Sequence, residues 1–393
     1  MVIYYRIFAI KQMDVMKKIL CAIVLFAGLS AISLSQDLNR VKEPDMLREL
    51  HRNEILIPDI PGYKTLKGDF HMHTIFSDGE VWPSVRVQEA YIEGLDVVAI
   101  TEHIEHRPHL DYLTGDHNTA YEIAAPSAER HNILLVRSAE ISRSMPPGHL
   151  NALFLEDANK LDTEDYMDAI EEANRQGGFL FWAHPGWLAQ QPDTNKWWPI
   201  HEELVQRGWL HGVEVYNWDE WYPIAFGWCN DKNLAYIANT DAHMVAAYRF
   251  NLARYHRPMT LVFAEERTVE SIRDAMFARR TAAFFLNNLA GPEHLLRELF
   301  DASVEVREPF MVSEKGVARL ELANPTDLTF ILENSSPLND SPQKITLRPR
   351  SSVIITCNIA DGEVRLPYSV ANLHTGMEEN LEVELAIPAL AAH

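Results

Sequence analysis

The sequence has little cysteine: its 393 residues include only Cys21, Cys229 and Cys357. Cys21 lies near the amino terminus, and the other two fall in segments that we assign to different domains. We therefore expect no disulfide between Cys229 and Cys357. A chain without a disulfide framework obtains its stability from hydrophobic cores and from any metals that it binds.

Positive charge is also scarce, with 35 Lys and Arg against 56 Asp and Glu, so the formal net charge is −21. Such a surface repels the phosphates of nucleic acids, and we expect no nucleic-acid polymer as a partner. The sequence also lacks a glycine-rich loop of the kind that cradles phosphates. A small phosphorylated substrate stays compatible with the charge, because a bound metal cluster can reverse the local field.

Only one long apolar run occurs, and it lies near the amino terminus. Met16-Lys17-Lys18 precedes the run ILCAIVLFAGLSAISL, and small residues at Ser33 and Ser35 stand just before residue 36. This order of a basic, an apolar and a small-residue region predicts a secretory signal peptide over residues 1–35. We therefore expect an exported protein, either periplasmic or extracellular.

Three alternatives concern the same segment. A transmembrane anchor is one, but the run is short for a hydrocarbon layer about 30 Å thick, so we expect no stable membrane insertion. A lipid anchor at Cys21 is another, although Leu20 is larger than the residue that normally precedes a lipidated cysteine. An upstream misread start is an alternative interpretation of residues 1–15.

Between residues 64 and 299, short apolar runs alternate with helical patterns. Such continuous apolar runs are typical of parallel strands that helices cover, so an α/β architecture follows. Seven strands suggest a closed or nearly closed barrel, with a doubly wound open sheet as the alternative. One helix is expected after the cap Asp162 and before Gly177, and another after the cap Thr268. The expected strands are KGDFHMH, DVVAITE, NILLVRSAE, HLNALFL, GFLFWAH, GVEVYN and LAYIANT.

The pattern changes near residue 300, where short strands follow one another with turn signals between them. The segments GVARLELAN, LTFILEN, KITLRPR, SVIITCNI and LEVELAIP show no helical stripe between them. We assign residues 300–393 to a small antiparallel β-sandwich domain. Residues 36–63 form an amino-terminal extension that precedes the α/β domain.

The strongest functional signal is the segment DFHMHTIFSDG. His71 and His73 are two residues apart, a spacing that places both imidazoles on the same side of a strand, and Asp78 follows in a turn. A second pair with this spacing, Asp241 and His243, also ends an apolar strand.

Single ligand-type residues stand near the ends of other expected strands. These are His103, Glu140, His149 and His184. Each alone is readily explained as a polar residue that caps a strand, but parallel barrels place their chemistry at these ends. Six imidazoles and three carboxylates exceed the four ligands of one tetrahedral zinc, so we expect two or three divalent ions. This mixed nitrogen and oxygen shell accepts Zn, Mn or Fe.

The order HMH…SDG, TEH, E, H, AHP and TDAH resembles the polymerase and histidinol phosphatase (PHP) family. The resemblance covers about residues 64–290. It implies an irregular (β/α)7 barrel similar to a TIM barrel, with a trinuclear metal centre in which Glu140 bridges two ions. Glu102, where the family often has Asp, is not at a ligand position. The residues at the family's ligand positions are His71, His73, Asp78, His103, Glu140, His149, His184, Asp241 and His243.

The export signal and the added β-domain are similar to secreted bacterial PHP phosphodiesterases that cleave small organophosphate diesters. We therefore predict a metal-dependent phosphodiesterase that acts on a small phosphoester, with a metal-bridging hydroxide as the nucleophile. Glu140, Asp241 and His243 are the expected catalytic residues, with Asp241 or a nearby histidine moving the proton.

Substrate contacts are expected from residues that follow strand ends. Arg143 and Arg249 could hold a phosphate, and Glu214 and Asn217 face the same rim or its wall. Tryptophans at 187, 218 and 221 could wall an apolar pocket for the organic part of an ester. The alternatives are solvated arginines and tryptophans that only pack between loops.

Two other functions remain open at this point. One is a phosphomonoesterase that acts on nucleotides or sugar phosphates, although a dianionic monoester calls for more cationic side chains than the sequence offers. The other is an exported metal-containing protein that binds glycan or cell wall through its β-domain. The natural substrate, the metal identity, the role of the β-domain and the oligomeric state are not fixed by the sequence.

Overall fold

The computed structural model describes residues 16–19, 50–336, 340–359 and 364–387. The chain divides into two compact units, Met1–His51 and Arg52–His393. In the first unit the described residues 16–19 are helical, and the rest of the expected signal peptide lies outside the described residues, as does Cys21. Among the helices of the described segments, none combines the length and the apolar character needed to cross a membrane.

A large mixed sheet begins the second unit. Its first strand pairs in parallel with β2, which pairs in parallel with β3, and it pairs on its other edge with the antiparallel β10. The sheet continues through β11 and β12 in antiparallel register. The bounds of these strands are β1 (Lys64–Asp69), β2 (Val97–Ala99), β3 (Leu134–Val136), β10 (Met259–Ala264), β11 (Thr281–Phe285) and β12 (Asn288–Ala290).

A six-stranded sheet carries the middle of the chain. Its strands β6, β7 and β9 are parallel neighbours, whereas β5 runs antiparallel to both β4 and β6. The bounds are β4 (Ser138–Ser142), β5 (His149–Leu153), β6 (Phe179–Trp182), β7 (Gly212–Asn217), β8 (Glu220–Trp221) and β9 (Ala235–Asn239).

The antiparallel β5 corrects the expectation that the predicted strands are parallel, and the antiparallel β10 was not predicted. Only a short turn joins β4 to β5, too few residues for the crossover that a parallel pair needs. Two isolated parallel bridges, Met72 with Ala242 and His103 with Glu140, connect the two sheets just beyond the strand ends. The observed architecture is therefore mixed α/β with two sheets joined at the edge where the polar residues gather.

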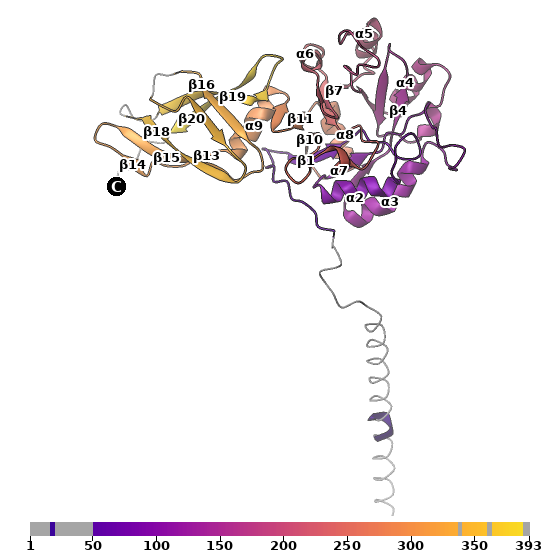
Figure 1. Cartoon of the computed structure of the whole chain (residues 1–393), viewed down its shortest axis with the longest axis horizontal. Coiled ribbons are helices and arrows are strands. Elements are labelled where there is room, and N and C mark those ends of the chain that lie inside the picture. The colour runs from indigo at the N-terminus through magenta and orange to yellow at the C-terminus, as the bar shows by residue number, and fades with distance from the viewer. Residues whose placement is uncertain (1–15, 20–49, 337–339, 360–363, 388–393) are drawn as a thin grey trace, which may run out of the picture. The chain divides into compact units, whose positions relative to one another are not determined.

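Helices lie between most of these strands, and α2 and α3 are neighbours in space (Figure 1). The helix expected after Asp162 begins later, because Asp165 is its cap and accepts a hydrogen bond from Met167 N at 2.9 Å. The expected cap Thr268 is confirmed, since its side chain accepts from Ser271 N at 3.1 Å. The bounds are α2 (Pro83–Ile92), α3 (Thr119–His131), η2 (Ala158–Leu161), α4 (Tyr166–Arg175), α5 (Pro199–Gln206), α6 (Pro223–Lys232), α7 (Ala246–Arg249), α8 (Val269–Phe277) and α9 (Glu293–Ser303).

The carboxyl-terminal part is all β in its described residues. One of its sheets contains β13, β14, β15 and β18, and the other strands join the large sheet through a parallel pairing of β12 with β19. Each strand expected from the sequence is present, but β13, β14 and β19 are additional strands that we did not predict. The bounds are β13 (Glu305–Val306), β14 (Met311–Val312), β15 (Val317–Asn324), β16 (Phe330–Asn334), β17 (Lys344–Leu347), β18 (Ser351–Asn358), β19 (Val364–His374) and β20 (Asn380–Ile387).

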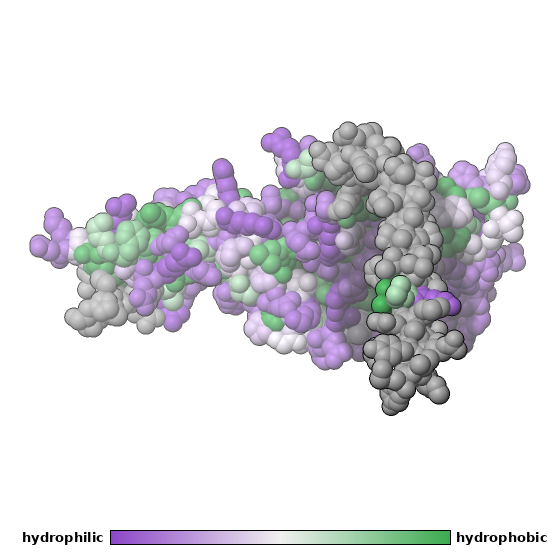
Figure 2. All heavy atoms as spheres, turned by 90° about the horizontal axis from the view of Figure 1, so that it is seen from below, coloured by the Kyte–Doolittle hydropathy of each residue, from purple (hydrophilic) through white to green (hydrophobic). Residues whose placement is uncertain are grey.

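Alternation of buried and exposed residues along β20 explains how this domain packs. Its residues alternate inward and outward, so one face supplies a core and the other meets solvent. Cys229 and Cys357 are both buried and free, as expected. Hydrophilic residues cover much of the surface visible in Figure 2, with apolar residues in separate patches between them.

Candidate metal centre

The two pairs of ligand-type residues lie side by side, just after β1 and β9. His73 N donates to Ala242 O at 3.0 Å, and Asp241 N donates to His71 O at 2.9 Å. These backbone bonds fix the two chain segments against each other beyond their strands. The spacing of two residues then directs all four side chains toward one region.

A buried ion-pair cluster supports this junction from below. Arg257 is fully buried and binds Asp69 at 2.9 Å and Glu93 at 2.7 Å. Asp69 in turn accepts a hydrogen bond from Thr240 Oγ1 at 2.7 Å, which ties the end of β1 to the end of β9. Removing one partner would leave a buried charge uncompensated, so this cluster holds the two segments in place.

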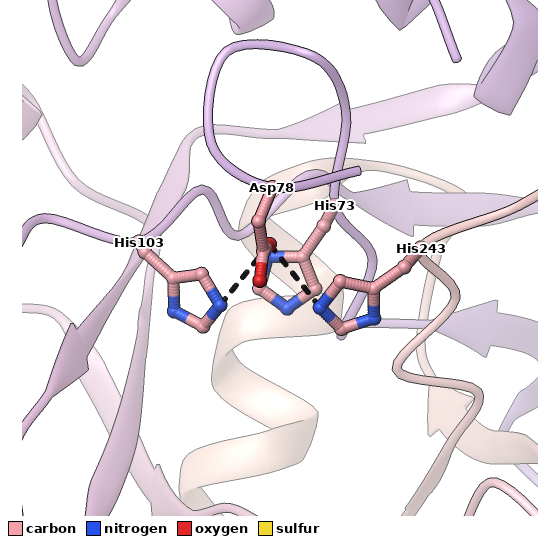
Figure 3. A group of neighbouring side chains, drawn as sticks. All are labelled: His73, Asp78, His103 and His243. Carbon is pink, nitrogen blue, oxygen red and sulfur yellow. Dashed lines mark ion pairs between the residues drawn. The ribbon is translucent and has the colours of Figure 1, made fainter. Parts of the chain in front are cut away.

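One group of possible ligands consists of His73, Asp78, His103 and His243 (Figure 3). The Asp78 carboxylate lies between two imidazoles, with Oδ1 3.3 Å from His103 Nε2 and 3.2 Å from His243 Nε2. The turn that carries Asp78 requires Gly79, because a Cβ there would meet the backbone of His73 at 2.6 Å. One candidate ligand atom from each residue lies within 4.8 Å of the others, which suits a divalent ion.

Glu140 on β4 connects further groups. Its Oε2 lies 3.3 Å from His71 Nε2 and 3.2 Å from His73 Nε2, while its Oε1 lies 2.6 Å from His149 Nδ1. The two oxygens of one carboxylate therefore face different imidazoles. The remaining groups compatible with a metal are His71, His184 and Asp241; His71, His73 and Glu140; and His103, Glu140 and His149.

The hydrogen bonding of these side chains is incomplete, so that cations could bind to the unsatisfied atoms. Several buried side-chain atoms make no hydrogen bond to the described residues, which is costly unless another group satisfies them. They include His73 Nε2, Asp78 Oδ1, Glu140 Oε1, His149 Nδ1, His184 Nδ1 and Asp241 Oδ1. These six atoms all belong to the nine residues selected from the sequence, so the donor set fits two or more divalent ions.

Electrostatics keep the carboxylates ionised. Burial alone would raise the pKa of Glu140, but the imidazoles of His103, His149 and His71 hold it well below its usual value. Asp241 behaves in the same way, because the charge on His71 outweighs burial and lowers the pKa of Asp241. Both carboxylates are thus ionised at neutral pH, which is the form that binds a metal ion.

The histidines respond in opposite directions. Burial would lower the pKa of His103, but the carboxylates of Glu140 and Asp78 raise it to about 10. Burial and the charge on His103 both lower the pKa of His73. His103 is therefore protonated at neutral pH when no metal is bound. A divalent ion would take the place of this proton, so metal binding should release protons.

Glu214 on β7 orients two of the imidazoles without belonging to any of the ligand groups. Its fully buried carboxylate lies 2.9 Å from His71 Nδ1 and accepts from His184 N at 2.7 Å. The amide groups of Asn217 and Asn239 donate to the same carboxylate at 2.8 and 2.9 Å. Carboxylates of this kind fix the ring orientation of a ligating histidine, so Glu214 acts behind the site rather than on its rim.

Glu102 supports the loop that carries Asp78 in a similar way. Its carboxylate accepts hydrogen bonds from the hydroxyls of Thr74 and Ser77 and from Thr74 N at 3.2 Å. It belongs to none of the ligand groups.

Three residues that follow strand ends, His184, Trp218 and Asp241, have φ angles of 29°, 55° and 51°. Such left-handed backbone is unfavourable for these residue types and is typical of functional sites.

A cavity of about 640 Å³ opens beside the ligand groups. The ring of Trp187 lies 5.2 Å from that of His184 and 5.8 Å from that of His149, so this tryptophan borders the centre directly. Trp221 instead packs on Tyr216 and is not part of the wall. The residues that line the cavity are Asp78, His103, His106, Ser142, His149, His184, Trp187, Asn217, Trp218, Asp219, Glu220, Tyr222, Asp241 and His243.

The two arginines expected to bind phosphate do not reach this cavity. Arg143 pairs with Glu105 at 2.5 Å and donates to Thr163 O at 2.8 Å. Arg249 pairs with Asp219 and lies over the ring of Trp218 at 5.1 Å. Both guanidinium groups pair with neighbouring loops and neither residue lines the cavity, so their contact with substrate stays a prediction.

Sequence reasoning missed several residues of the cavity wall. His106, Ser142, Asp219, Glu220 and Tyr222 were not selected. Ser142 ends β4, and the segment that carries Asp219, Glu220 and Tyr222 follows β7, so the position after a strand end could have indicated them.

The fold and the cluster together define a metal-dependent phosphoesterase. A two-domain protein from Bacteroides vulgatus containing a predicted PHP-like metal-dependent phosphoesterase is 43% identical and superposes with a TM-score of 0.83. The alignment covers 86% of this chain and 100% of that one. The chain therefore belongs to the PHP-like metal-dependent phosphoesterases.

Other comparisons add less. Residues 304–386 match the family DUF5001, described as an Ig-like domain. A protein from Bifidobacterium adolescentis described as a metal-dependent phosphoesterase is 16% identical, with a TM-score of 0.37 over 45% of this chain and 87% of its own. An amidohydrolase from Chromobacterium violaceum is 14% identical, with a TM-score of 0.35 over 46% and 88%. No curated protein matches the chain.

Proposed function

We propose that this protein is an exported phosphodiesterase of small organic phosphate diesters, built on an irregular (β/α)7 barrel with a carboxyl-terminal β-sandwich. The observation that carries the proposal is the cavity beside the ligand groups. Its lining contains two tryptophans and a tyrosine but neither Lys nor Arg. Aromatic rings in the lining suit the organic substituents of a diester, and the ligand groups suit its single phosphoryl charge.

We assign the nine ligand-type residues to a trinuclear centre of Zn, Mn or Fe ions, with Glu140 as the bridging carboxylate. Four overlapping groups of these residues support more than one ion, since Glu140 belongs to two of them and its oxygens face different imidazoles. Divalent ions in such a site supply a nucleophilic water at neutral pH and neutralise the phosphoryl oxygens.

In the proposed reaction, water adds to phosphorus, the bond from phosphorus to the leaving alcohol oxygen breaks, and that oxygen gains a proton. Asp241 and His243 lie next to each other at the cavity wall and are placed to move the protons. Trp187 borders the imidazoles of His149 and His184, where it would orient the organic group and exclude water.

The charge of the substrate distinguishes this function from phosphomonoester hydrolysis. A diester carries one negative charge and a monoester up to two near pH 7, so a monoester gains more from cationic side chains at the site. The cavity wall supplies none from Lys or Arg, and the net charge of −21 opposes a dianion more strongly.

The test is kcat/KM for a diester and a monoester with the same aryl leaving group, measured on metal-reconstituted protein. We expect the diester to be preferred by about tenfold or more, equivalent to about 1.4 kcal/mol in transition-state binding. A tenfold preference for the monoester would overturn the diesterase assignment in favour of a phosphatase. Absence of metal-dependent turnover of either ester would instead support a protein that only binds glycan or cell wall.

Export is part of the proposal and is supported by the amino-terminal pattern of residues 1–35. Expression of the full chain with its amino terminus intact, followed by fractionation and amino-terminal sequencing, tests it. We expect the mature chain outside the cytoplasm and beginning near residue 36. An intact amino terminus on cytoplasmic protein would contradict export.

A further inference from the structure

The cavity wall that faces the ligand groups is aromatic and acidic. Trp187, Trp218 and Tyr222 supply the rings, and Asp219 and Glu220 supply carboxylates that belong to none of the ligand groups. The carboxylates follow β7 in the segment that forms β8 and its preceding turn. The wall therefore presents negative charge and aromatic faces in the same cavity as the ligand groups, which in the proposed function bind the phosphate.

The two carboxylates differ in their neighbours. Asp219 is compensated, because Arg249 pairs with it from outside the cavity lining. Glu220 forms no ion pair with a Lys or Arg of the described residues, and it accepts a hydrogen bond from the hydroxyl of Tyr222. That bond fixes the carboxylate of Glu220 against an aromatic ring at the cavity wall, where its charge stays uncompensated.

Such a wall discriminates between substituents by their charge. The faces of Trp and Tyr rings attract a cation, and this attraction grows as water is excluded. A neutral substituent would cover Glu220 and remove water from it without compensation, which is unfavourable. An anionic substituent would add direct repulsion. A compact alkylammonium group satisfies both the carboxylate and the rings.

We propose that the favoured substrates are zwitterionic phosphate diesters, in which one alcohol carries a quaternary or primary ammonium group that binds against Glu220 and Tyr222. This inference rests on the proposed diesterase function. The single phosphoryl anion would be held at the ligand groups, and the cation of the same molecule would lie at Glu220 in the lining of the same cavity. A cavity of about 640 Å³ accommodates a diester of this size.

The test uses two p-nitrophenyl diesters that share a leaving group and differ only in charge. One carries choline as its second alcohol, and the other carries 3,3-dimethylbutanol, in which carbon replaces the quaternary nitrogen. On metal-loaded full-length protein we expect kcat/KM for the choline ester to exceed that of the neutral ester by about tenfold. Glu220→Gln keeps the side-chain shape and an acceptor for Tyr222, and it should reduce this ratio toward one.

A matched control is Glu203→Gln, which makes the same change at an exposed glutamate of α5 that pairs with Arg207 outside the cavity. It should leave the ratio at its wild-type value. Equal kcat/KM for the two esters in the wild-type protein, or an unchanged ratio in Glu220→Gln, would overturn the inference while leaving the diesterase function intact.

A binding measurement separates the inference from turnover. Calorimetric titration of the metal-loaded protein with choline and with 3,3-dimethylbutanol should show tighter binding of choline, and Glu220→Gln should remove the difference. If neither diester is hydrolysed, the diesterase function fails, and the titration still decides the preference of the wall for a cation. Equal affinity for the two alcohols would refute that preference.

Discussion

At the scale of single residues, Glu140 occupies the most connected position of the site. Its oxygens approach imidazoles that come from the end of β1 and from β5, so its loss would affect more than one group of possible ligands. His149 belongs to only one such group and is partly exposed. A carboxylate shared between groups should therefore contribute more than a terminal imidazole.

We expect Glu140→Gln to remove at least about tenfold more activity than His149→Asn, with a larger loss of bound metal. Each variant keeps a polar side chain of comparable size, so packing changes little. Phosphoesterase rates and metal content by elemental analysis, measured on the same preparations, check this. Equal losses of activity at equal metal content would argue against a bridging role.

His201 links pH to stability outside the metal site. Its Nε2–H donates to Pro147 O at 2.7 Å, its Nδ1 accepts from Trp198 N at 3.3 Å, and its ring stacks on Trp182. Burial lowers the pKa of His201 to about 4, although the hydrogen bond to Pro147 O acts in the opposite direction. The unfolded chain takes up this proton near pH 6.5, so unfolding binds a proton between pH 6.5 and 4.

Stability from His201 is accordingly present above pH 6.5 and lost as the pH falls toward 4, by up to about 1.4 kcal/mol per pH unit. His201→Gln should abolish this contribution, so the wild-type advantage in unfolding free energy should be larger at pH 7 than at pH 4.5. Denaturant unfolding of both proteins at each pH measures it. Both retain the same ligand residues, and a pH-independent difference would contradict the assignment.

The nine ligand-type residues could be selected from the sequence because their signal is local. The spacing of two residues, as in His71 and His73, can be read directly from the sequence. The same is true of a position just after an apolar strand. The partners of Arg143 and Arg249 could not be selected, because Glu105 and Asp219 approach them through loops that no local pattern specifies. Glu214 was noticed, but its position behind His71 depends on the pairing of β7 with β9.

At the scale of elements, the loops after β6 and β7 determine what the site can accept. Trp187 follows β6 and has 41% of its surface exposed, which is high for a residue packed beside two imidazoles. A large ring that remains exposed next to reactive groups is available for a substrate.

Trp187→Ala should lower kcat/KM for an aryl diester by about tenfold, mainly through a higher KM, and affect the matched monoester less. The physical reason is that only the diester places a second organic group near this ring. Trp209→Ala is a suitable control, since Trp209 packs against Arg207 away from the cavity. The same loss for both esters would show that Trp187 serves the fold rather than the substrate.

Sequence patterns predicted most elements, and the exceptions have physical reasons. β5 reads as one more apolar strand, and its reversed direction follows from the length of the turn before it. β19 contains Pro367, a residue that argues against a strand in the sequence, yet its ladder with β20 passes through Pro367 opposite Glu384. The helix α4 is capped by Asp165 rather than Asp162, because Asp162 is instead the C-cap of η2.

At the scale of the whole molecule, the candidate metal centre connects the two sheets of the α/β domain. Its ligand groups draw residues from the ends of β1, β2, β6 and β9 and from β4 and β5. Many buried polar atoms there lack a hydrogen bond among the described residues. Cations that satisfy them should stabilise the folded protein as well as support its chemistry.

Active protein purified without a refolding step should therefore contain at least two equivalents of transition metal per chain. Its removal by a chelator should abolish activity and lower the melting temperature by several degrees, and re-addition should restore both. Elemental analysis and thermal unfolding on the same sample provide the measurement. One equivalent or less in fully active protein would rule out a multinuclear centre.

The parallel pairing of β12 with β19 has a consequence for synthesis on the ribosome. The chain emerges from its amino terminus, so β12 appears before α9 and the strands from β13 to β18, and its partner β19 follows only after them. Until then one edge of β12 has no partner in the sheet and can pair with other chains. Translation stopped before residue 364 should thus yield nascent chains that depend on chaperones, even though every ligand-type residue has already been made.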